Sequence, residues 1–173
     1  MSAKPYGPLV QNGWVVKDID AAIKYWTETW AVGPFFKFPK IVWETGFYRG
    51  KDMIPDYDAA VAYNGEFMVE LIKPNGPSIF QEALDSGNVG VQHMCAMTDD
   101  LAAATAYIEK RGGVAIQGGT FADGSALTYF DMGGRGDSHI LEIAQLLEGP
   151  QQLFAAIKAA AASWDGKTPV MTL

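Results

Sequence analysis

The chain repeats one order of hydrophobic and polar positions in its two halves. Apolar residues alternate with other side chains from Leu9 to Val16, as they do in a half-buried strand. Asp18 follows at the position of a helix N-cap, where a short carboxylate can accept hydrogen bonds from the first free backbone amides. Apolar side chains then recur at helical spacing, at Ile19, Ile23, Trp26 and Trp30. This segment is predicted to be a strand, a cap and a helix.

The second half shows the same order. An apolar alternating run over 89–97 precedes Asp100, which stands where the helix cap is expected. The apolar positions of the helix that follows are Leu101, Ala104 and Ile108. The offset that carries Asp18 onto Asp100 also carries Gln11 onto His93. One structural unit is therefore expected twice in this chain.

Three further strands are predicted behind each helix, where short apolar runs are bounded by turn residues. They fall near 35–44, 58–64 and 66–72 in the first half, and near 114–118, 126–132 and 138–146 in the second. We therefore expect an α+β fold of two tandem βαβββ modules, at about residues 8–73 and 88–146, followed by a C-terminal helical tail at 149–173. Neither module would bury its sheet face well alone, so the 173 residues are expected to form a single domain.

Composition and charge narrow the range of partners. The net charge of −7 and the pI of about 4.7 come without a run of Lys or Arg, so no nucleic-acid partner is expected. Polar residues interrupt every apolar stretch before it reaches the roughly 20 residues that a membrane span needs. Cys95 is the only cysteine and the N-terminal residues lack a signal-peptide pattern, so a cytoplasmic location is expected.

Four metal-capable side chains fall at matching points of the two predicted modules. They are Gln11, Glu70, His93 and Glu142. Because alternate residues of a strand share a face, each of the four lies among apolar neighbours on a face that is predicted to point inward. A buried carboxylate or amide without a partner costs roughly several kcal/mol. One divalent cation bound by all four would satisfy them together.

An alternative interpretation applies to each of these residues when it is taken alone. A single polar residue in a strand is more often a hydrogen-bonded core or edge residue than a metal ligand. Placement in a repeat favours the metal site. The set has three oxygen donors, one imidazole nitrogen and no thiolate. Such a set is suited to Zn, Mn, Co, Ni or Fe and is not typical of a closed structural zinc site.

Several short motifs resemble those of a known superfamily. They are Gln11-Asn-Gly-Trp-Val-Val-Lys-Asp18, Val32-Gly33-Pro34-Phe35-Phe36, Met68-Val-Glu70-Leu, Gln92-His93-Met and His139-Ile-Leu-Glu142-Ile. In their order and spacing they resemble the vicinal oxygen chelate superfamily over about residues 8–146. The resemblance is nearest to the glyoxalase I and methylmalonyl-CoA epimerase types. It implies paired βαβββ modules whose curved mixed sheets surround a metal-binding pocket, and it implies a homodimer.

The resemblance also implies a metal and a reaction. Gln11, Glu70, His93 and Glu142, in that order, are similar to the ligand set of zinc-type glyoxalase I, so Zn, Ni, Co or Mn is expected, and Fe less so. The implied activity is that of a metal-dependent isomerase, epimerase or lyase. Such an enzyme moves a proton on the carbon next to a metal-bound carbonyl or hydroxyl. Glu142 is then the first candidate for the catalytic base and Glu70 the second.

The substrate is expected to be a small, apolar molecule. Aromatic residues are concentrated in the first module, at Phe35, Phe36, Phe38, Trp43, Phe47, Tyr48, Tyr57 and Tyr63, where they are predicted to form one pocket wall or ordinary core. Glutathione is not favoured, because Val15 and Pro74 stand where glyoxalase I has an Arg and an Asn that bind it. No basic cluster is present for the phosphates of CoA.

Two other functions stay open at the level of sequence. A ring-cleaving extradiol dioxygenase would require iron, and members of that class bind it with two His and one Glu. A non-catalytic protein that binds antibiotic-type small molecules is the other alternative. The complete set of metal-capable residues weighs against it.

Overall fold

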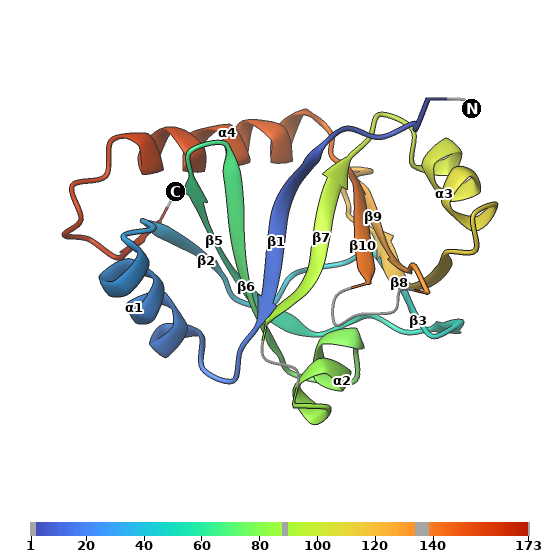
Figure 1. The fold of residues 1–173 in the computed structure, drawn as a ribbon, viewed down its shortest axis with the longest axis horizontal. Coiled ribbons are helices and arrows are strands. Elements are labelled where there is room, and N and C mark those ends of the chain that lie inside the picture. Colours follow the sequence, from blue (N-terminus) through green and yellow to red (C-terminus); the bar gives the residue numbers. More distant parts are fainter. Residues whose placement is uncertain (1–2, 88–89, 134–138, 173) are drawn as a thin grey trace.

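The computed structural model describes residues 3–87, 90–133 and 139–172. Within them, 4 helices pack on one mixed, curved sheet of 11 strands, so the predicted α+β class is confirmed (Figure 1). The strands are β1 (Leu9–Val15), β2 (Phe35–Phe38), β3 (Thr45–Tyr48), β4 (Lys51–Asp52), β5 (Tyr57–Asn64), β6 (Phe67–Pro74), β7 (Val91–Met97), β8 (Val114–Thr120), β9 (Ala126–Asp131), β10 (Ile140–Gln145) and β11 (Val170–Met171). The helices are α1 (Ile19–Trp30), α2 (Ile79–Asp85), α3 (Leu101–Glu109) and α4 (Glu148–Ala162).

The two halves of the chain follow the same pairing scheme. The strand order is β11-β2-β5-β6-β1-β7-β10-β9-β8-β3-β4. In the first half β1 pairs in parallel with β6, which is antiparallel to β5; in the second half β7 pairs in parallel with β10, which is antiparallel to β9. The antiparallel pair of β1 and β7 joins the two halves at the centre of the sheet. The first strands of the two halves, β1 and β7, therefore lie side by side. The limits of the two modules stay a prediction.

The two helices of the repeat, α1 and α3, each follow one of the predicted aspartate caps. Asp18 Oδ1 accepts hydrogen bonds from the backbone amides of Asp20 and Ala21, both at 3.0 Å. Asp100 Oδ1 accepts one from the amide of Ala103 at 2.9 Å. Each cap satisfies amide groups that have no partner inside the helix. Figure 1 shows α1 and α3 at opposite ends of the sheet, where each covers its own buried apolar cluster.

The strand predicted near 35–44 is shorter in the structure. It ends at Phe38, because Pro39 lacks a backbone N–H and Lys40 adopts a left-handed conformation with φ of 54°. The chain then crosses to the far edge of the other half, where β3 pairs antiparallel with β8. The segment that connects β2 to β5 therefore links the first half of the chain to the second.

Helix α2 has no counterpart in the sequence prediction. It is a short helix, and Ser78 caps it by accepting a hydrogen bond from the backbone amide of Gln81 at 3.2 Å. Its Ile79 and Phe80 are buried in a core cluster that includes aromatic residues from both halves. Short helices produce only a brief periodic pattern, so their packing decides whether they form.

Helix α4 runs along the upper edge of the sheet in Figure 1. It begins at Glu148, one residue before the predicted helical tail at 149–173, and ends at Ala162. Its buried Ile157 packs with Phe36, Val61 and Met68. Among the described residues, none of the helices combines the length and the hydrophobicity that a membrane span requires.

Candidate metal centre

The four candidate ligands lie on the four central strands of the sheet. Gln11 is on β1, Glu70 on β6, His93 on β7 and Glu142 on β10. Their positions follow the repeat: Gln11 pairs with Met68 as His93 pairs with Ile140, and each glutamate lies two residues further along its strand. Because residues two apart share a face, all four side chains are directed toward the same side of the sheet.

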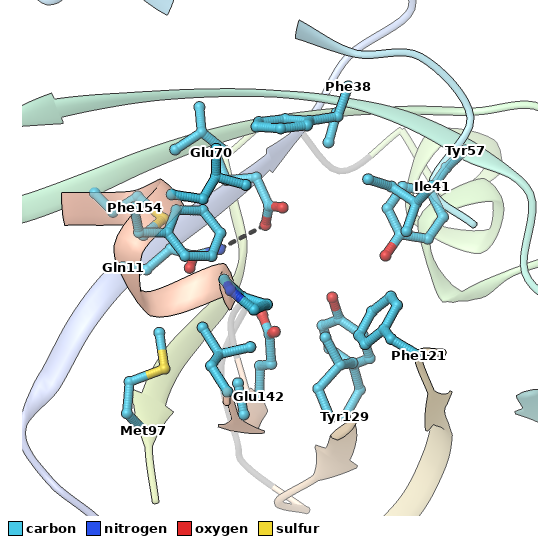
Figure 2. Close-up of a pocket in the computed structure, with 18 residues that line it drawn as sticks. Gln11, Phe38, Ile41, Tyr57, Glu70, Met97, Phe121, Tyr129, Glu142 and Phe154 are labelled. Carbon is cyan, nitrogen blue, oxygen red and sulfur yellow. Dashed lines mark hydrogen bonds between the residues drawn. The ribbon is translucent and has the colours of Figure 1, made fainter. Parts of the chain in front are cut away.

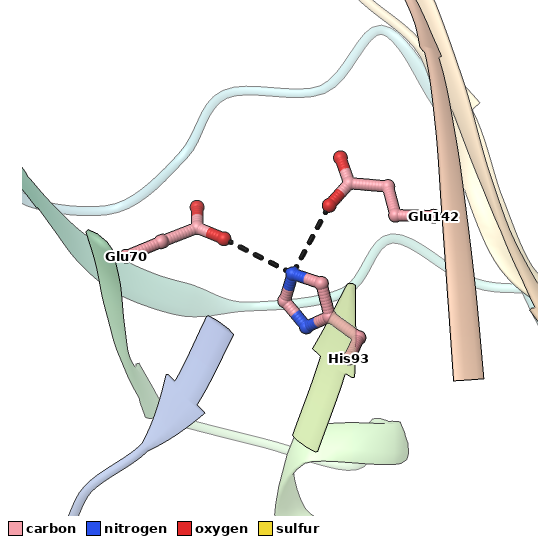
Figure 3. A group of neighbouring side chains, drawn as sticks. All are labelled: Glu70, His93 and Glu142. Carbon is pink, nitrogen blue, oxygen red and sulfur yellow. Dashed lines mark ion pairs between the residues drawn. The ribbon is translucent and has the colours of Figure 1, made fainter. Parts of the chain in front are cut away.

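Three of these residues form a close group, as Figure 3 shows. His93 Nε2 lies 3.3 Å from Glu70 Oε2 and 3.1 Å from Glu142 Oε2. Ligand atoms of all three residues lie within 4.8 Å of one another, which is close enough for one metal ion. Gln11 joins the group through its amide, which donates a hydrogen bond to Glu70 Oε2 at 2.6 Å. The structure therefore brings together all four residues that the sequence indicated.

The donor atoms of this group fit a divalent ion. Among the described residues, the buried His93 Nε2 and Glu142 Oε2 have no hydrogen-bond partner, although they lie only 3.1 Å apart. Their separation is that of an ion pair, but their directions are not those of a hydrogen bond. Buried polar atoms without partners are costly, and a cation between an imidazole and two carboxylates would satisfy them. This group could hold a divalent metal ion.

Two neighbours orient the imidazole ring. His93 Nδ1 lies 2.8 Å from Gln92 Oε1, so a proton on Nδ1 leaves the Nε2 lone pair directed toward the carboxylates. Gly13 provides space for the ring, because a Cβ atom added there would lie 1.9 Å from His93 Cε1. Both residues lie within motifs that the sequence analysis quoted, but neither Gly13 nor Gln92 was assigned a role there. The only available signal was that Gln92 adjoins a predicted ligand.

Burial and neighbouring charges shift the pKa values of His93 and Glu70. Burial lowers the pKa of His93, but the nearby carboxylates of Glu142 and Glu70 outweigh this effect and raise that pKa to about 9. Burial raises the pKa of Glu70, and the neighbouring charge of Glu142 raises it further, although the nearby imidazole of His93 opposes both. Without a metal ion, a proton on His93 therefore balances part of the negative charge. A bound cation would replace that proton.

The group forms part of the wall of a cavity of about 190 Å³ (Figure 2). This volume is below the roughly 300–1,000 Å³ of common ligand pockets, so the cavity suits a small molecule. Its aromatic lining is Phe38, Tyr57, Phe121, Tyr129 and Phe154. Only Phe38 and Tyr57 come from the aromatic residues that the sequence predicted for this wall. Phe35 instead packs in the cluster beneath α1, and Phe36 in the cluster beneath α4.

Other chemically capable residues have separate partners. Arg49 forms an ion pair with Glu82 at 2.6 Å. His139 lies 3.4 Å from Asp131, outside the metal group. Cys95 is fully buried, and burial raises the pKa of its thiol well above the usual value. None of these side chains belongs to the group of candidate ligands.

Comparisons with known proteins place the fold. The chain is similar to methylmalonyl-CoA epimerase from Mycobacterium tuberculosis, at 15% identity over 88% of this chain and 96% of that one, with a TM-score of 0.59. It is similar to a hypothetical protein from Bacillus halodurans, at 14% identity over 82% and 95%, with a TM-score of 0.60. A variant of Streptomyces coelicolor methylmalonyl-CoA epimerase in complex with 2-nitronate-propionyl-CoA matches at 18% identity over 83% and 99%, with a TM-score of 0.59. No curated protein sequence matches the chain.

The family model matches most of the chain. It is described as the Glyoxalase/Bleomycin resistance protein/Dioxygenase superfamily, and its match covers residues 10–130, which include three of the four candidate ligands. This is the vicinal oxygen chelate superfamily that the sequence motifs resemble. The chain belongs to the glyoxalase/bleomycin resistance protein/dioxygenase superfamily.

Proposed function

We propose that this protein is a metal-dependent isomerase, epimerase or lyase of the glyoxalase type. It would move a proton on a carbon next to a carbonyl or hydroxyl of a small, apolar substrate. One observation carries the proposal: a histidine and two carboxylates, with ligand atoms within 4.8 Å of one another, lie at an apolar cavity. Two of the similar structures are methylmalonyl-CoA epimerases, which supports an isomerase or epimerase as the class to test first.

Gln11, Glu70, His93 and Glu142 would hold one Zn, Ni, Co or Mn ion, with Fe less favoured. Such an ion, when bound, supplies a Lewis acid that polarises a substrate oxygen and makes the neighbouring C–H more acidic. Gln11 holds Glu70 by its hydrogen bond, and Gln92 holds the ring of His93. These hydrogen bonds hold the side chains of Glu70 and His93 in place before the metal ion binds, so less side-chain freedom is lost on binding.

Glu142 is the proposed base and Glu70 the proposed second carboxylate. Glu70 and Glu142 come from different halves of the chain and lie on either side of His93 Nε2 (Figure 3). A substrate between them would have one carboxylate near each face, so that one could take the proton and the other return it. The apolar lining lowers the local dielectric constant, which strengthens the electrostatic interactions between the site and the substrate.

The test combines metal analysis with a proton-transfer assay. Protein purified without chelator should contain about one equivalent of metal, and His93→Ala should contain none. The metal-loaded protein should accelerate exchange of the methylene protons of 2-hydroxyacetophenone in D2O, followed by NMR. Glu142→Gln should keep a neutral oxygen donor for the metal, yet slow this exchange by about 100-fold or more.

Other outcomes of these measurements would favour the alternatives. About one equivalent of iron, with oxygen consumption in the presence of catechols, would indicate an extradiol dioxygenase. Its two-histidine ligand set has no counterpart among the described residues, where one histidine joins the group. No metal after reconstitution would contradict the proposal and favour a binding protein.

We also expect a cytoplasmic homodimer, and light scattering should then give twice the chain mass of 18.7 kDa.

A further inference from the structure

Two tyrosine hydroxyl groups face one another inside the cavity. Tyr57 on β5 and Tyr129 on β9 come from different halves of the chain, and their side chains are buried, with exposed fractions of 3% and 1%. Figure 2 shows both hydroxyl groups directed toward each other, on the side of the cavity away from Phe154. Ring contacts alone do not require these oxygen atoms, because a phenylalanine would fill nearly the same space.

The tyrosine pair adjoins the candidate metal centre. Tyr129 is the cross-strand partner of Glu142, so the two side chains share one face of the sheet. The ring of Tyr129 packs edge-on against that of His93, with centroids 5.2 Å apart, and edge-on against Phe80 at 5.4 Å. A small molecule bound at the metal centre would therefore extend toward the two hydroxyl groups.

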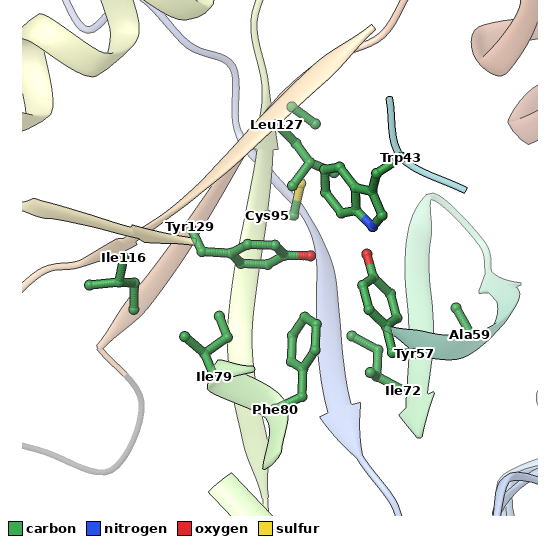
Figure 4. Packing of buried hydrophobic residues seen from close by; sticks show 11 residues of the cluster. Trp43, Tyr57, Ala59, Ile72, Ile79, Phe80, Cys95, Ile116, Leu127 and Tyr129 are labelled. Carbon is green, nitrogen blue, oxygen red and sulfur yellow. The ribbon is translucent and has the colours of Figure 1, made fainter. Parts of the chain in front are cut away.

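A third hydrogen-bond donor lies behind the pair. The ring of Trp43 lies 6.3 Å from that of Tyr57, and Figure 4 shows its indole nitrogen on the side of the tyrosine hydroxyls. This nitrogen is buried and has no hydrogen-bond partner in the part of the chain that the structure describes. An indole N–H can only donate, whereas each hydroxyl both donates and accepts. The three side chains together offer three donor hydrogens but only two acceptor oxygen atoms. An acceptor atom supplied by a ligand would therefore give a buried donor a partner.

The charges around the cavity limit what that acceptor can be. Two glutamates, Glu70 and Glu142, line the cavity, and none of the described residues that line it is Lys or Arg. The charge of a metal ion bound at the candidate centre would already be balanced by these two glutamates, so a carboxylate or phosphate at the tyrosine pair would be buried without a cation of its own. A carbonyl or ether oxygen would accept the same hydrogen bonds without that cost.

We propose that Tyr57 and Tyr129 form a subsite that binds an uncharged carbonyl or ether oxygen at the far end of an aromatic substrate. The ring would lie between the aromatic side chains that line the cavity. This inference rests on the proposed function, because the opposite end of the substrate is placed at the metal centre. It defines the substrate class as small aromatic compounds that carry two separate oxygen functions.

Three hydroxamic acids test the subsite, because a hydroxamate binds divalent metals and leaves the rest of the molecule to probe the cavity. 4-Acetylbenzohydroxamic acid presents a distal carbonyl, 4-isopropenylbenzohydroxamic acid has the same shape without that oxygen, and 4-carboxybenzohydroxamic acid presents a charge. Binding to the zinc-loaded protein would be measured by calorimetry. The acetyl probe should bind about tenfold more tightly than the isopropenyl probe, as one added hydrogen bond provides. The carboxy probe should bind more weakly than both.

Variants assign the preference to the tyrosines. Tyr57→Phe and Tyr129→Phe should each retain metal and isopropenyl-probe affinity but reduce the acetyl preference to about twofold or less. Tyr63→Phe, at a tyrosine outside this cavity, should keep the full preference. Equal binding of the acetyl and isopropenyl probes to the wild type would overturn the subsite, and tightest binding of the carboxy probe would overturn its neutrality. Absence of binding by all three probes would instead contradict the metal centre, so the two failures are distinguishable.

Discussion

At the scale of single residues, the absence of a side chain at Gly13 is as important as the presence of one at His93. The imidazole ring occupies the space that a Cβ atom at Gly13 would need, with a closest approach of 1.9 Å to Cε1. The neighbouring strands β1 and β7 pair at this point, so backbone movement would disturb the centre of the sheet. The glycine therefore acts as a positioning residue for a proposed ligand.

Gly13→Ala should weaken metal binding by about 10–100-fold, as displaced support of a ligand does in other metal sites. The reason is that the imidazole must rotate away from Glu70 and Glu142 to make space for the methyl group. A competition titration with a fluorescent zinc chelator would measure the affinity. Gly90→Ala is the matched control, because nothing lies within 4 Å of its added Cβ atom. Unchanged zinc affinity in Gly13→Ala would show that the imidazole position does not depend on this glycine.

The pKa of His93 predicts a pH-dependent stability for the metal-free protein. Burial lowers this pKa, but the carboxylates of Glu142 and Glu70 raise it to about 9, above the value of about 6.5 in an unfolded chain. The folded state therefore binds the proton more tightly. The resulting stabilisation is fully present below about pH 6.5 and is lost as the pH rises through about 9.

The melting temperature of the metal-free protein should accordingly fall between about pH 7 and pH 9.5, measured by calorimetry in EDTA. Glu142→Gln should show a smaller fall, because one of the carboxylates that raise the pKa of His93 is absent. With saturating zinc the fall should disappear, since the cation takes the place of the proton. A melting temperature that rises over this range would contradict the proposed charge balance.

At the scale of elements, the two repeat helices begin with the same residue type but differ in their caps. The carboxylate of Asp18 accepts two backbone hydrogen bonds, whereas that of Asp100 accepts one. Because capping contributes through these bonds, α1 should depend on its cap more than α3 does.

Asp18→Ala and Asp100→Ala should each lower the free energy of unfolding by about 0.5–2 kcal/mol, with the larger loss at Asp18. Urea titrations followed by circular dichroism would measure both. Asp99→Ala is the control, because this exposed aspartate precedes the cap, and it should change the free energy by less than about 0.5 kcal/mol. Equal and negligible effects at all three positions would show that helix packing alone holds these termini.

At the scale of the whole molecule, the candidate metal centre takes its residues from both halves of the chain. Glu70 comes from β6 in the first half, while His93 and Glu142 come from β7 and β10 in the second. A ligand that binds only the folded state stabilises it in proportion to its occupancy. The ion would therefore hold together the junction at which β1 pairs with β7.

Free zinc at 100 times its dissociation constant should stabilise the protein by about 2.7 kcal/mol. For a chain of this size, that corresponds to a rise in melting temperature of about 5–11 °C. The comparison is between zinc-loaded and EDTA-treated protein. His93→Ala should show no rise under the same conditions, and an equal rise in this variant would indicate that zinc binds elsewhere.

Much of this arrangement was accessible from the sequence because it depends on local rules. Alternation along β1 and β7 puts Gln11 and His93 on one face, and the repeat relates Glu70 to Glu142. Helix caps depend on residues within one turn, so Asp18 could also be recognised. The chemistry of the ligands and the order of the elements follow from these patterns.

Contacts between distant segments were decided only by the tertiary structure. The pairing of β3 with β8, the burial of α2 and the meeting of Tyr57 with Tyr129 each join residues far apart along the chain. Strand alternation states which residues share a face, but not which strand edge is free or which cavity that face borders. The sequence determined which side chains could bind a metal ion. Packing of the two halves decided what surrounds this candidate site, because cavities form between elements and not within them.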